Sequence, residues 1–290
     1  MASGGGAAPP GGWVQTVRVG LMHSLLVSAS PVRDRSTVAA WIAGAVGRGE
    51  RVLYKHAPTE DAAAVLGRSL PEVGLDPAVL TSGQVQLADT TVLRAETDGR
   101  HGGLYGLHRE QLRQAIREGF AGLALTGDAA AMHTITRTDA ELAGYERDLE
   151  RLATEAGVRS LCRYPPGERP GLLHEMLVVH YRDVDDEVWG AELVDGCLRV
   201  HGEIDFTAAD RFAAVLRAAL TTGVRTVDAS GLAFCDVAAV RVLVSAAQEL
   251  QREDVPLALV GSDGVLTRLL AATGADQWAR LRVIGRDADA

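Results

Sequence analysis

The chain has 290 residues, of which 47% are hydrophobic, and a formal net charge of -9. The length suits about two domains of ordinary size, and no apolar run reaches the roughly 18 to 20 residues that a membrane span requires. The acidic balance argues against a nucleic-acid partner, because binding to phosphates depends on clustered lysine and arginine.

The cysteines and histidines show no local pattern of a metal or disulfide site. Cys162, Cys197 and Cys235 are an odd number without paired spacing, and the eight histidines lack a spacing such as His-Glu-x-x-His. We therefore expect no metal, no cofactor and a reducing, cytoplasmic setting. Residues 1–18 are expected to form a disordered tail, and residues 286–290 a second tail.

Lys55 is the only lysine of the chain, and it bears on catalysis. A phosphate-binding loop needs glycines before a lysine and a Ser or Thr after it, whereas Lys55 lies in "RVLYKHA". A Gly-x-Ser-x-Gly nucleophile turn is also missing. The sequence therefore predicts that the protein is not an enzyme.

In the first 180 residues, short apolar runs alternate with segments of helical periodicity. This alternation predicts an α/β unit with a mostly parallel sheet covered by helices. The capping box of Thr138 and Glu141 marks the start of one helix, and Gly157 its end. The expected strands are 23–31, 51–57, 79–87, 121–128 and 158–165, and the expected helices are 38–47, 59–70, 107–120, 138–157 and 171–180. The polar, acid-rich residues 181–186 are expected to form a linker.

Ligands of open parallel sheets bind beyond the carboxyl ends of the strands. The sequence places Ser28 and four ligand-sensing candidates at this rim: Ser30, His56, Asp128 and Tyr164. The fifth candidate, His23, begins a strand and is expected near the opposite end. The competing interpretation is that these are ordinary strand-end residues, and that His23 is a hydrogen-bonded core histidine.

The remaining chain predicts a small α/β domain with a mixed sheet. Two strands flank an Asp-Gly pair, which is typical of a hairpin. Thr207 and Asp210 are expected to cap the first helix. The expected strands are 187–194, 197–205, 224–230, 255–261 and 279–285, and the helices run from about 207, 237 and 264.

This second domain resembles a STAS domain over residues 187–285. The motifs are "LRVHGEIDFTAADRF", "VRTVDASGLAFCDVAAVRVLVSAAQEL" and "PLALVGSDGVLTRLLAATG". In the sigma-factor regulators of this family, the middle motif usually reads Asp-Ser-Ser-Gly, and its second serine is phosphorylated by an anti-sigma factor kinase. Ala238 stands at that position here, so the resemblance implies a degenerate phosphosite.

The helix that begins at Val237 has an apolar stripe and a more polar face. Ala238, Arg241 and Ser245 follow at helical spacing on the polar face. We expect the partner surface to comprise Asp236, Val237, Ala238, Ala239, Arg241 and Ser245. The alternative is that "VAAV" is only the packed first turn of a buried helix. Ser230 and Ser245 are other possible acceptors, but neither aligns with the family site.

The first domain resembles a MEDS domain, the methanogen and methylotroph sensory family, over residues 19–180. The resemblance rests on His23 and on "GERVLY", "GFAGLALTGD", "YERDLERL" and "SLCRYP". It implies a RecA-like core without nucleotide machinery and a role in sensing small molecules. The family often has glutamate after "TG", where this chain has Asp128.

Together these features predict a bacterial signalling regulator of the anti-sigma factor antagonist type. Its STAS domain would bind an anti-sigma factor kinase of the GHKL-type ATPase fold, under control of an unidentified ligand of the sensory domain. The alternative is a scaffold subunit of a STAS-based assembly that cannot be phosphorylated. An enzyme on the RecA-like core is a third hypothesis, which the lysine argument opposes. Nucleic-acid and membrane partners are not expected.

Overall fold

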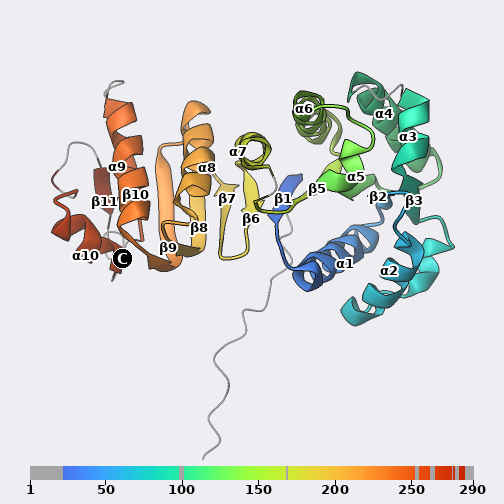
Figure 1. The fold of residues 1–290 in the computed structure, drawn as a ribbon, viewed down its shortest axis with the longest axis horizontal. Coiled ribbons are helices and arrows are strands. Elements are labelled where there is room, and N and C mark those ends of the chain that lie inside the picture. The colour runs from blue at the N-terminus through green and yellow to red at the C-terminus, as the bar shows by residue number, and fades with distance from the viewer. Residues whose placement is uncertain are drawn as a thin grey trace, which may run out of the picture.

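The computed structural model describes residues 22–97, 101–167, 169–251, 255–261, 265–275, 277 and 281–284. These residues form an α/β protein built on one sheet of 11 strands, in the order β11-β10-β9-β8-β7-β6-β1-β5-β4-β2-β3 (Figure 1). The strands are β1 (His23–Val27), β2 (Arg51–His56), β3 (Val85–Asp89), β4 (Leu123–Asp128), β5 (Arg159–Tyr164), β6 (Asp183–Asp185), β7 (Trp189–Val194), β8 (Cys197–Ile204), β9 (Thr226–Cys235), β10 (Leu257–Val260) and β11 (Leu281–Ile284).

The helices lie on both faces of this sheet. They are α1 (Pro31–Gly47), α2 (Ala62–Ser69), α3 (Thr90–Thr97), α4 (His101–Arg117), α5 (Ala129–His133), α6 (Asp139–Ala156), α7 (Pro170–Val179), α8 (Ala209–Thr221), α9 (Val237–Gln251) and α10 (Val265–Ala272), with short 3-10 turns at Pro71–Val73 and Pro77–Leu80. Within the described ranges, none of them combines the length and the apolar run needed to cross a bilayer.

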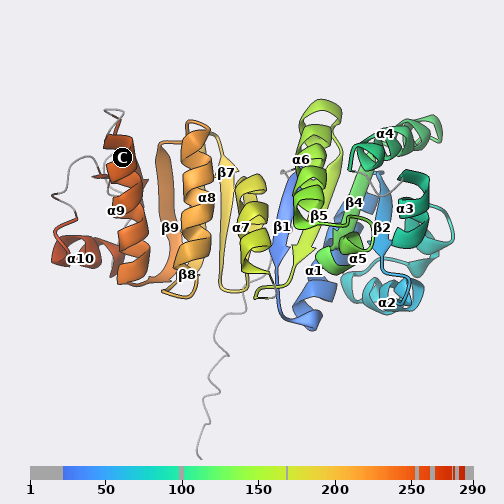
Figure 2. The same ribbon diagram turned by 45° about the horizontal axis from the view of Figure 1, so that its top comes forward.

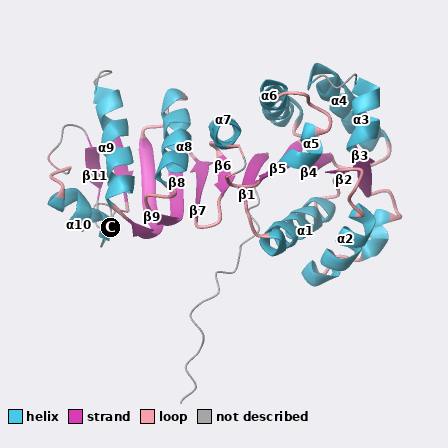
Figure 3. Cartoon of the chain, in the orientation of Figure 1, coloured by secondary structure: helices cyan, strands magenta, loops and turns pink. Residues whose placement is uncertain are grey.

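Strand direction divides the sheet into a parallel part and a mixed part. Neighbouring strands are parallel everywhere except between β6 and β7 and between β7 and β8 (Figure 3). The expected mostly parallel first domain and mixed second domain are thus both confirmed. The hairpin from β7 to β8 turns at Asp195 and Gly196, which both have positive φ angles, as an Asp-Gly turn requires.

Two hydrophobic cores follow from the alternation of side chains along the strands. Helices α4, α6, α7, α8 and α9 stand in a row on one face, where each packs on the next (Figures 1 and 2). Their apolar stripes share one cluster of buried residues that runs from Leu25 to Leu281. Helices α1 and α2 cover the other face beside β1, β2 and β5, over a separate cluster that contains Leu26 and Ile42.

The acid-rich segment 181–186, which we expected to form a linker, contributes the short strand β6 (Asp183–Asp185) to the sheet. Strand β6 pairs in parallel with β1 and antiparallel with β7. Two carboxylates of the segment are paired with arginines. Asp185, the last residue of β6, lies 2.8 Å from Arg33 Nη2, and the buried Asp186, which follows it, lies 2.7 Å from Arg211 Nε. The high acidic content therefore reflects ion pairs at the junction of the two parts of the sheet, and it does not mark a solvated linker.

Three local expectations also differ from the structure. Helix α8 is not capped by Thr207 and Asp210; the carboxylate of Asp205 instead accepts hydrogen bonds from the amides of Thr207 and Ala208. The third strand is shifted to Val85–Asp89, because Pro77–Leu80 forms a 3-10 turn. Helices α3 and α5 were not expected. The cap of α6 by Thr138 is confirmed by its hydrogen bond with the Glu141 amide.

Loss of the carboxylate of Asp186 should destabilise the junction. In Asp186→Asn, the guanidinium of Arg211 on α8 stays in place but loses its buried counter-charge. We therefore expect the free energy of unfolding to fall by about 1–3 kcal/mol. Asp185→Asn is the matched control, because the more exposed pair with Arg33 should contribute less than about 1 kcal/mol. Urea denaturation measures both values, and equal losses would contradict the prediction.

Candidate functional site

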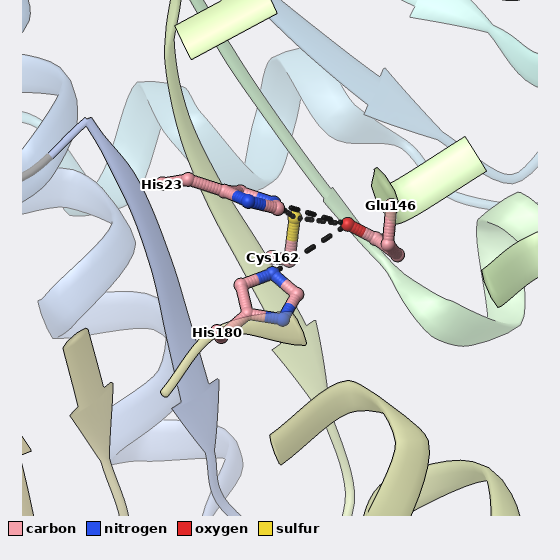
Figure 4. Close-up of side chains that lie close together, drawn as sticks. All are labelled: His23, Glu146, Cys162 and His180. Atoms are coloured by element: carbon pink, nitrogen blue, oxygen red, sulfur yellow. Dashed lines mark hydrogen bonds and ion pairs between the residues drawn. The ribbon is translucent and has the colours of Figure 1, made fainter. Parts of the chain in front are cut away.

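Four buried side chains with metal-ligating atoms converge on one face of the sheet in the first domain (Figure 4). They are His23, Glu146, Cys162 and His180, and each is almost inaccessible to solvent. Because burying polar and charged groups is costly unless they are paired, this cluster is the strongest candidate for a functional site in the described part of the domain.

Four separate elements supply these side chains. His23 begins β1, and Cys162 lies in the middle of β5, which pairs with β1 so that Leu25 is opposite Cys162. Side chains two residues apart share a face of a strand, so both point toward α6 and α7. Glu146 comes from the buried side of α6, and His180 directly follows the last residue of α7.

One carboxylate oxygen of Glu146 lies at the centre of the cluster. Its Oε2 is 3.3 Å from His23 Nε2 and 3.5 Å from His180 Nε2. The Cys162 thiol donates a hydrogen bond to the same oxygen at 2.9 Å, and Cys162 Sγ lies 3.6 Å from His23 Nε2. The four ligating atoms lie within 4.8 Å of one another.

The other polar atoms of these side chains have partners outside the cluster. His23 Nδ1 lies 3.1 Å from Glu150 Oε2, and His180 Nδ1 lies 2.8 Å from the carbonyl of Met176. The hydroxyl of Tyr164 donates to Oε1 of Glu146 at 2.9 Å. These contacts fix the two rings and the carboxylate, so that Nε2 of His23 and Nε2 of His180 both face Oε2 of Glu146.

Burial and the mutual interactions of these groups set their protonation. Burial by itself would raise the pKa of Glu146, but the interactions with His180 and His23 outweigh it and hold this pKa well below its usual range. Burial would lower the pKa of His23, yet hydrogen bonds to Glu146 and Glu150 raise it. Burial, with the nearby charge of Glu146, raises the pKa of the Cys162 thiol well above its usual value. The cluster thus holds one carboxylate, a protonated thiol and two imidazoles.

A second buried array, formed by Lys55, Tyr145 and His108, adjoins the cluster. Lys55 donates to the Tyr145 hydroxyl, which lies 3.1 Å from His108 Nε2, and His108 Nδ1 lies 2.8 Å from Gln111 Oε1. Lys55 fits here because residue 127 is glycine: a Cβ at that position would lie 3.1 Å from the Cβ of Lys55. The only lysine of the chain is therefore buried beside the cluster, and this burial lowers the pKa of its ammonium group.

The rim at the carboxyl end of β1 is closed by the chain's own carboxylate. Glu187, between β6 and β7, accepts hydrogen bonds from the amides of Ala29 at 2.7 Å and Ser30 at 3.1 Å. The Ser30 hydroxyl also caps α1 through the amide of Arg33. The two residues that precede α1 thus bind a carboxylate, and that carboxylate comes from the junction with the second domain.

The other rim candidates lie apart from the cluster. Asp128 caps α5 and lies 3.6 Å from Arg163 Nη2. His56 lies against the Tyr54 ring, and its Nδ1 is 2.9 Å from the Ala57 carbonyl. Of the five ligand-sensing candidates, the structure brings together only His23 and Tyr164.

The sequence reasoning did not single out Glu146, Cys162, His180 or the buried role of Lys55. Glu146 and Cys162 lie inside "YERDLERL" and "SLCRYP", the motifs that carry the family resemblance. A usable signal was present at Glu146, which lies four residues after Leu142 and therefore on the apolar side of α6. His180 gave no signal, because 157 positions separate it from His23 and only the folded chain brings the two rings to 4.0 Å between centroids.

The predicted partner surface lies at the start of α9 in the second domain. Asp236 precedes the helix, and its Oδ1 accepts hydrogen bonds from the amides of Ala238 at 2.7 Å and Ala239 at 3.3 Å. Its Oδ2 accepts from the amide of Phe206 at 2.9 Å, which holds the loop after β8 beside the helix. The segment is helical from Val237, as expected.

The side chains at this helix start differ in exposure. Val237, Arg241 and Ser245 are exposed, Ala238 is half-buried, and the exposed rings of Phe206 and Phe234 lie on the adjoining segments. Ala239 is buried in the core, so its inclusion in the expected partner surface was wrong: position 239 lies on the apolar side of α9 with Val240 and Leu243. We call the exposed residues Phe206, Phe234, Val237, Arg241 and Ser245 the α9 face.

The buried array predicts a specific dependence of stability on pH. Burial and the charge of Lys55 lower the pKa of His108 to about 3, against 6.5 for an exposed histidine. A folded-state pKa below the unfolded value gives stability that is complete above pH 6.5 and is lost as the pH falls toward 3. In His108→Gln, which keeps one donor and one acceptor for Gln111 and Tyr145, we expect the fall in unfolding free energy from pH 7 to pH 5 to be about 1–2 kcal/mol smaller than in the native chain.

Urea denaturation at both pH values measures this difference. His174→Gln on the exposed side of α7 is the control, and it should leave the pH dependence of the native chain unchanged. Identical pH dependence of His108→Gln and the native chain would show that His108 is not held neutral in the folded protein.

Comparison with known proteins agrees with the division of the chain. The family model "MEthanogen/methylotroph, DcmR Sensory domain" (MEDS) matches residues 22–181, and the STAS domain model matches residues 189–284. No curated protein sequence matches the chain.

Two solved structures are similar at low sequence identity. A putative anti-sigma factor antagonist from Thermotoga maritima is 17% identical, with a TM-score of 0.29, over 34% of this chain and 86% of that chain. The DUF1998 helicase MrfA bound to DNA is 15% identical, with a TM-score of 0.34, over 91% of this chain and 40% of that chain. The matches of the family models are the stronger finding: the chain belongs to the MEDS family and carries a STAS domain after its MEDS sensory domain.

Proposed function

We propose that this protein is a signalling regulator whose STAS domain binds an anti-sigma factor kinase through the α9 face. The observation that carries the proposal is the exposed, mostly apolar surface around Asp236, at the position where regulators of this domain type carry their phosphosite. Phe206 is 76% exposed there and Val237 40% exposed. Clustered exposed apolar side chains of this kind are typical of protein interaction sites.

Asp236 gives this surface its shape. A single carboxylate joins the loop after β8 to the first turn of α9 through hydrogen bonds to three amides. The rings and the helix start are thereby held in one arrangement before a partner arrives, which lowers the entropy cost of binding.

The lack of a hydroxyl at position 238 determines how this surface is regulated. A phosphate brings about two negative charges, and at position 238 they would lie beside the Asp236 carboxylate. That charge would repel an acidic partner and compete for the amides of the helix start. Because Ala238 cannot accept a phosphate, phosphorylation at the position used by the family cannot release a partner from the α9 face, and in this proposal control comes from the sensory domain.

The route that we propose from the sensory domain to the STAS domain runs through β6 and α7. Strand β6 pairs with β1 on one side and β7 on the other, and α7 packs on α8. Glu187 and Asp185 connect this strand to the start of α1. In the proposed function, a change at the sensory site alters these contacts and thereby the STAS domain.

A charge on the α9 face should weaken partner binding. Val237→Asp places a carboxylate next to Asp236 in the middle of the apolar surface, and we expect the dissociation constant for the kinase to rise at least about tenfold, or about 1.4 kcal/mol. Val265→Asp is the matched control, because Val265 is also 40% exposed but begins α10. Isothermal titration calorimetry distinguishes the two, and equal effects of both changes would place the partner elsewhere.

A hydroxyl at position 238 should restore the switch. With the kinase and ATP, Ala238→Ser should take up about one phosphate per chain and then release the kinase, whereas the native chain should take up none. Intact-protein mass spectrometry measures the added phosphate. Stoichiometric phosphate on the native STAS domain, or a bound kinase that ignores the new serine, would refute the assignment of Ala238. A large self-assembly in light scattering without a one-to-one kinase complex would support the scaffold alternative.

A further inference from the structure

We infer that His23, Glu146, Cys162 and His180 together form a binding site for one divalent transition-metal cation of the zinc class. The inference concerns the sensory domain and does not depend on which protein binds the α9 face. Its basis is the geometry of four buried ligating atoms from four different elements of the fold (Figure 4).

Three of the six distances between the ligating atoms match those of a tetrahedral site. With metal–ligand bonds of about 2.0–2.3 Å, neighbouring atoms of a tetrahedron lie about 3.3–3.6 Å apart. The distances from Glu146 Oε2 to the two histidine Nε2 atoms are 3.3 and 3.5 Å, and Cys162 Sγ lies 3.6 Å from His23 Nε2. The distance from Sγ to Oε2 is shorter, at 2.9 Å, because the thiol proton forms a hydrogen bond there. Removal of that proton would let the two atoms separate.

The ring of His180 has a buried nitrogen that protein groups leave unsatisfied. Its Nδ1 donates a hydrogen bond to the carbonyl of Met176 at 2.8 Å, so the neutral ring presents a lone pair at Nε2. This Nε2 has no hydrogen-bond partner among the described residues, and it faces an oxygen of Glu146 at 3.5 Å. In the neutral ring this lone pair and the carboxylate oxygen would repel each other, whereas a proton or a metal cation between them satisfies both.

The outer contacts are those that metal ligands require. A ligating histidine usually donates its other ring N–H to a carboxylate or a backbone carbonyl, which fixes the tautomer and the direction of the ring. His23 has Glu150 at 3.1 Å in this position, and His180 has the Met176 carbonyl. The remaining oxygen of Glu146 accepts from Tyr164. All three contacts therefore aim ligating atoms at one point.

The charges of the cluster define the class of metal. A thiolate and a carboxylate supply two negative charges, which a divalent cation neutralises, and two neutral imidazoles complete the set. On binding, the metal replaces two protons, that of Cys162 and the Nε2 proton through which His23 contacts Glu146. A metal–sulfur and a metal–nitrogen bond form, the S–H and N–H bonds break, and both protons pass to solvent. Thiolate and imidazole ligands favour Zn²⁺ over Mg²⁺ and Ca²⁺, which prefer oxygen. Four protein ligands also match the closed type of zinc site.

The test uses the full chain, without a histidine tag, after removal of metals with a chelator. Titration with Co²⁺ should give one site per chain, with d–d absorption of a tetrahedral ion and a near-ultraviolet charge-transfer band from the thiolate. Zn²⁺ should then displace Co²⁺ and abolish both bands. Elemental analysis after dialysis should find about one zinc per chain.

Matched variants separate this site from adventitious binding. Cys162→Ser should lose the charge-transfer band, whereas Cys197→Ser should keep it. His180→Gln should weaken Zn²⁺ binding more than 100-fold, whereas His174→Gln on the exposed side of α7 should bind as the native chain does. Glu150→Gln, which removes an outer contact only, should weaken binding about 10- to 100-fold.

A measurement on the native chain tests the inference even if some variants fail to fold. Stoichiometric Zn²⁺ should raise the unfolding temperature of the metal-free native protein, since the ligand binds the folded state. The inference is overturned if the native chain binds no Co²⁺ or Zn²⁺ at one per chain, or if its unfolding temperature does not change with Zn²⁺. It is also overturned if Cys197→Ser loses the charge-transfer band and Cys162→Ser keeps it.

Discussion

The burial of one carboxylate, that of Glu146, constrains the whole sensory domain. An isolated charge in a protein interior is strongly destabilising unless partners surround it. Glu146 lies on the apolar side of α6, so its partners must come from the sheet beneath and from the neighbouring helix. His23 from β1, Cys162 and Tyr164 from β5, and His180 after α7 fill these places. The position of α6 over β1 and β5 is thereby fixed by polar contacts as well as by packing.

The same cluster lies next to the junction of the two domains. His180 is followed after two residues by β6, and the Asp183 amide donates to the His180 carbonyl at 2.9 Å. Ser24, which follows His23 in β1, donates to the carboxylate of Asp183. The short strand that joins the two parts of the sheet is thus held by residues adjacent to both histidines. These contacts connect both histidines to β6.

The features that local physics determines could be predicted from the sequence. The Asp-Gly turn between β7 and β8 and the Thr138 cap of α6 each depend on a few adjacent residues, and both are present. The alternation of strands and helices also followed from periodicity. Helix α3 could not be predicted in this way: "TTVLRAET" is rich in β-branched residues with low helix propensity, and Leu93 is nevertheless buried in the core cluster. Tertiary packing decides the conformation there.

The candidate site was harder to predict than the fold, because no two of its four ligating residues are close in the sequence. Glu146 and Cys162 are separated by 16 positions, and His23 and His180 by 157. Rules based on local spacing detect metal sites that lie on one helix or one loop, whereas this cluster depends on the register of β1 with β5 and on where α7 ends. The ion pairs of residues 181–186 were missed for a related reason. Composition shows that residues 181–186 are acidic, but the arginines that pair with them, Arg33 and Arg211, are supplied by distant helices.

A regulator of the proposed kind could be switched on its STAS domain or in its sensory domain, and this chain has the residues for only one of the two. In the proposed function, a phosphate switch on the STAS domain would act at position 238, and the side chain there is a methyl group. A switch in the sensory domain needs a buried site whose occupancy changes the contacts of the junction. The cluster around Glu146 has this property, because His23 lies on β1, which pairs with β6, and His180 precedes β6 by two residues. Glu187, on the other side of β6 in the chain, binds the amides that precede α1. In the proposed function, a change at the sensory site therefore acts through the junction of the domains, and it alters partner binding at the α9 face.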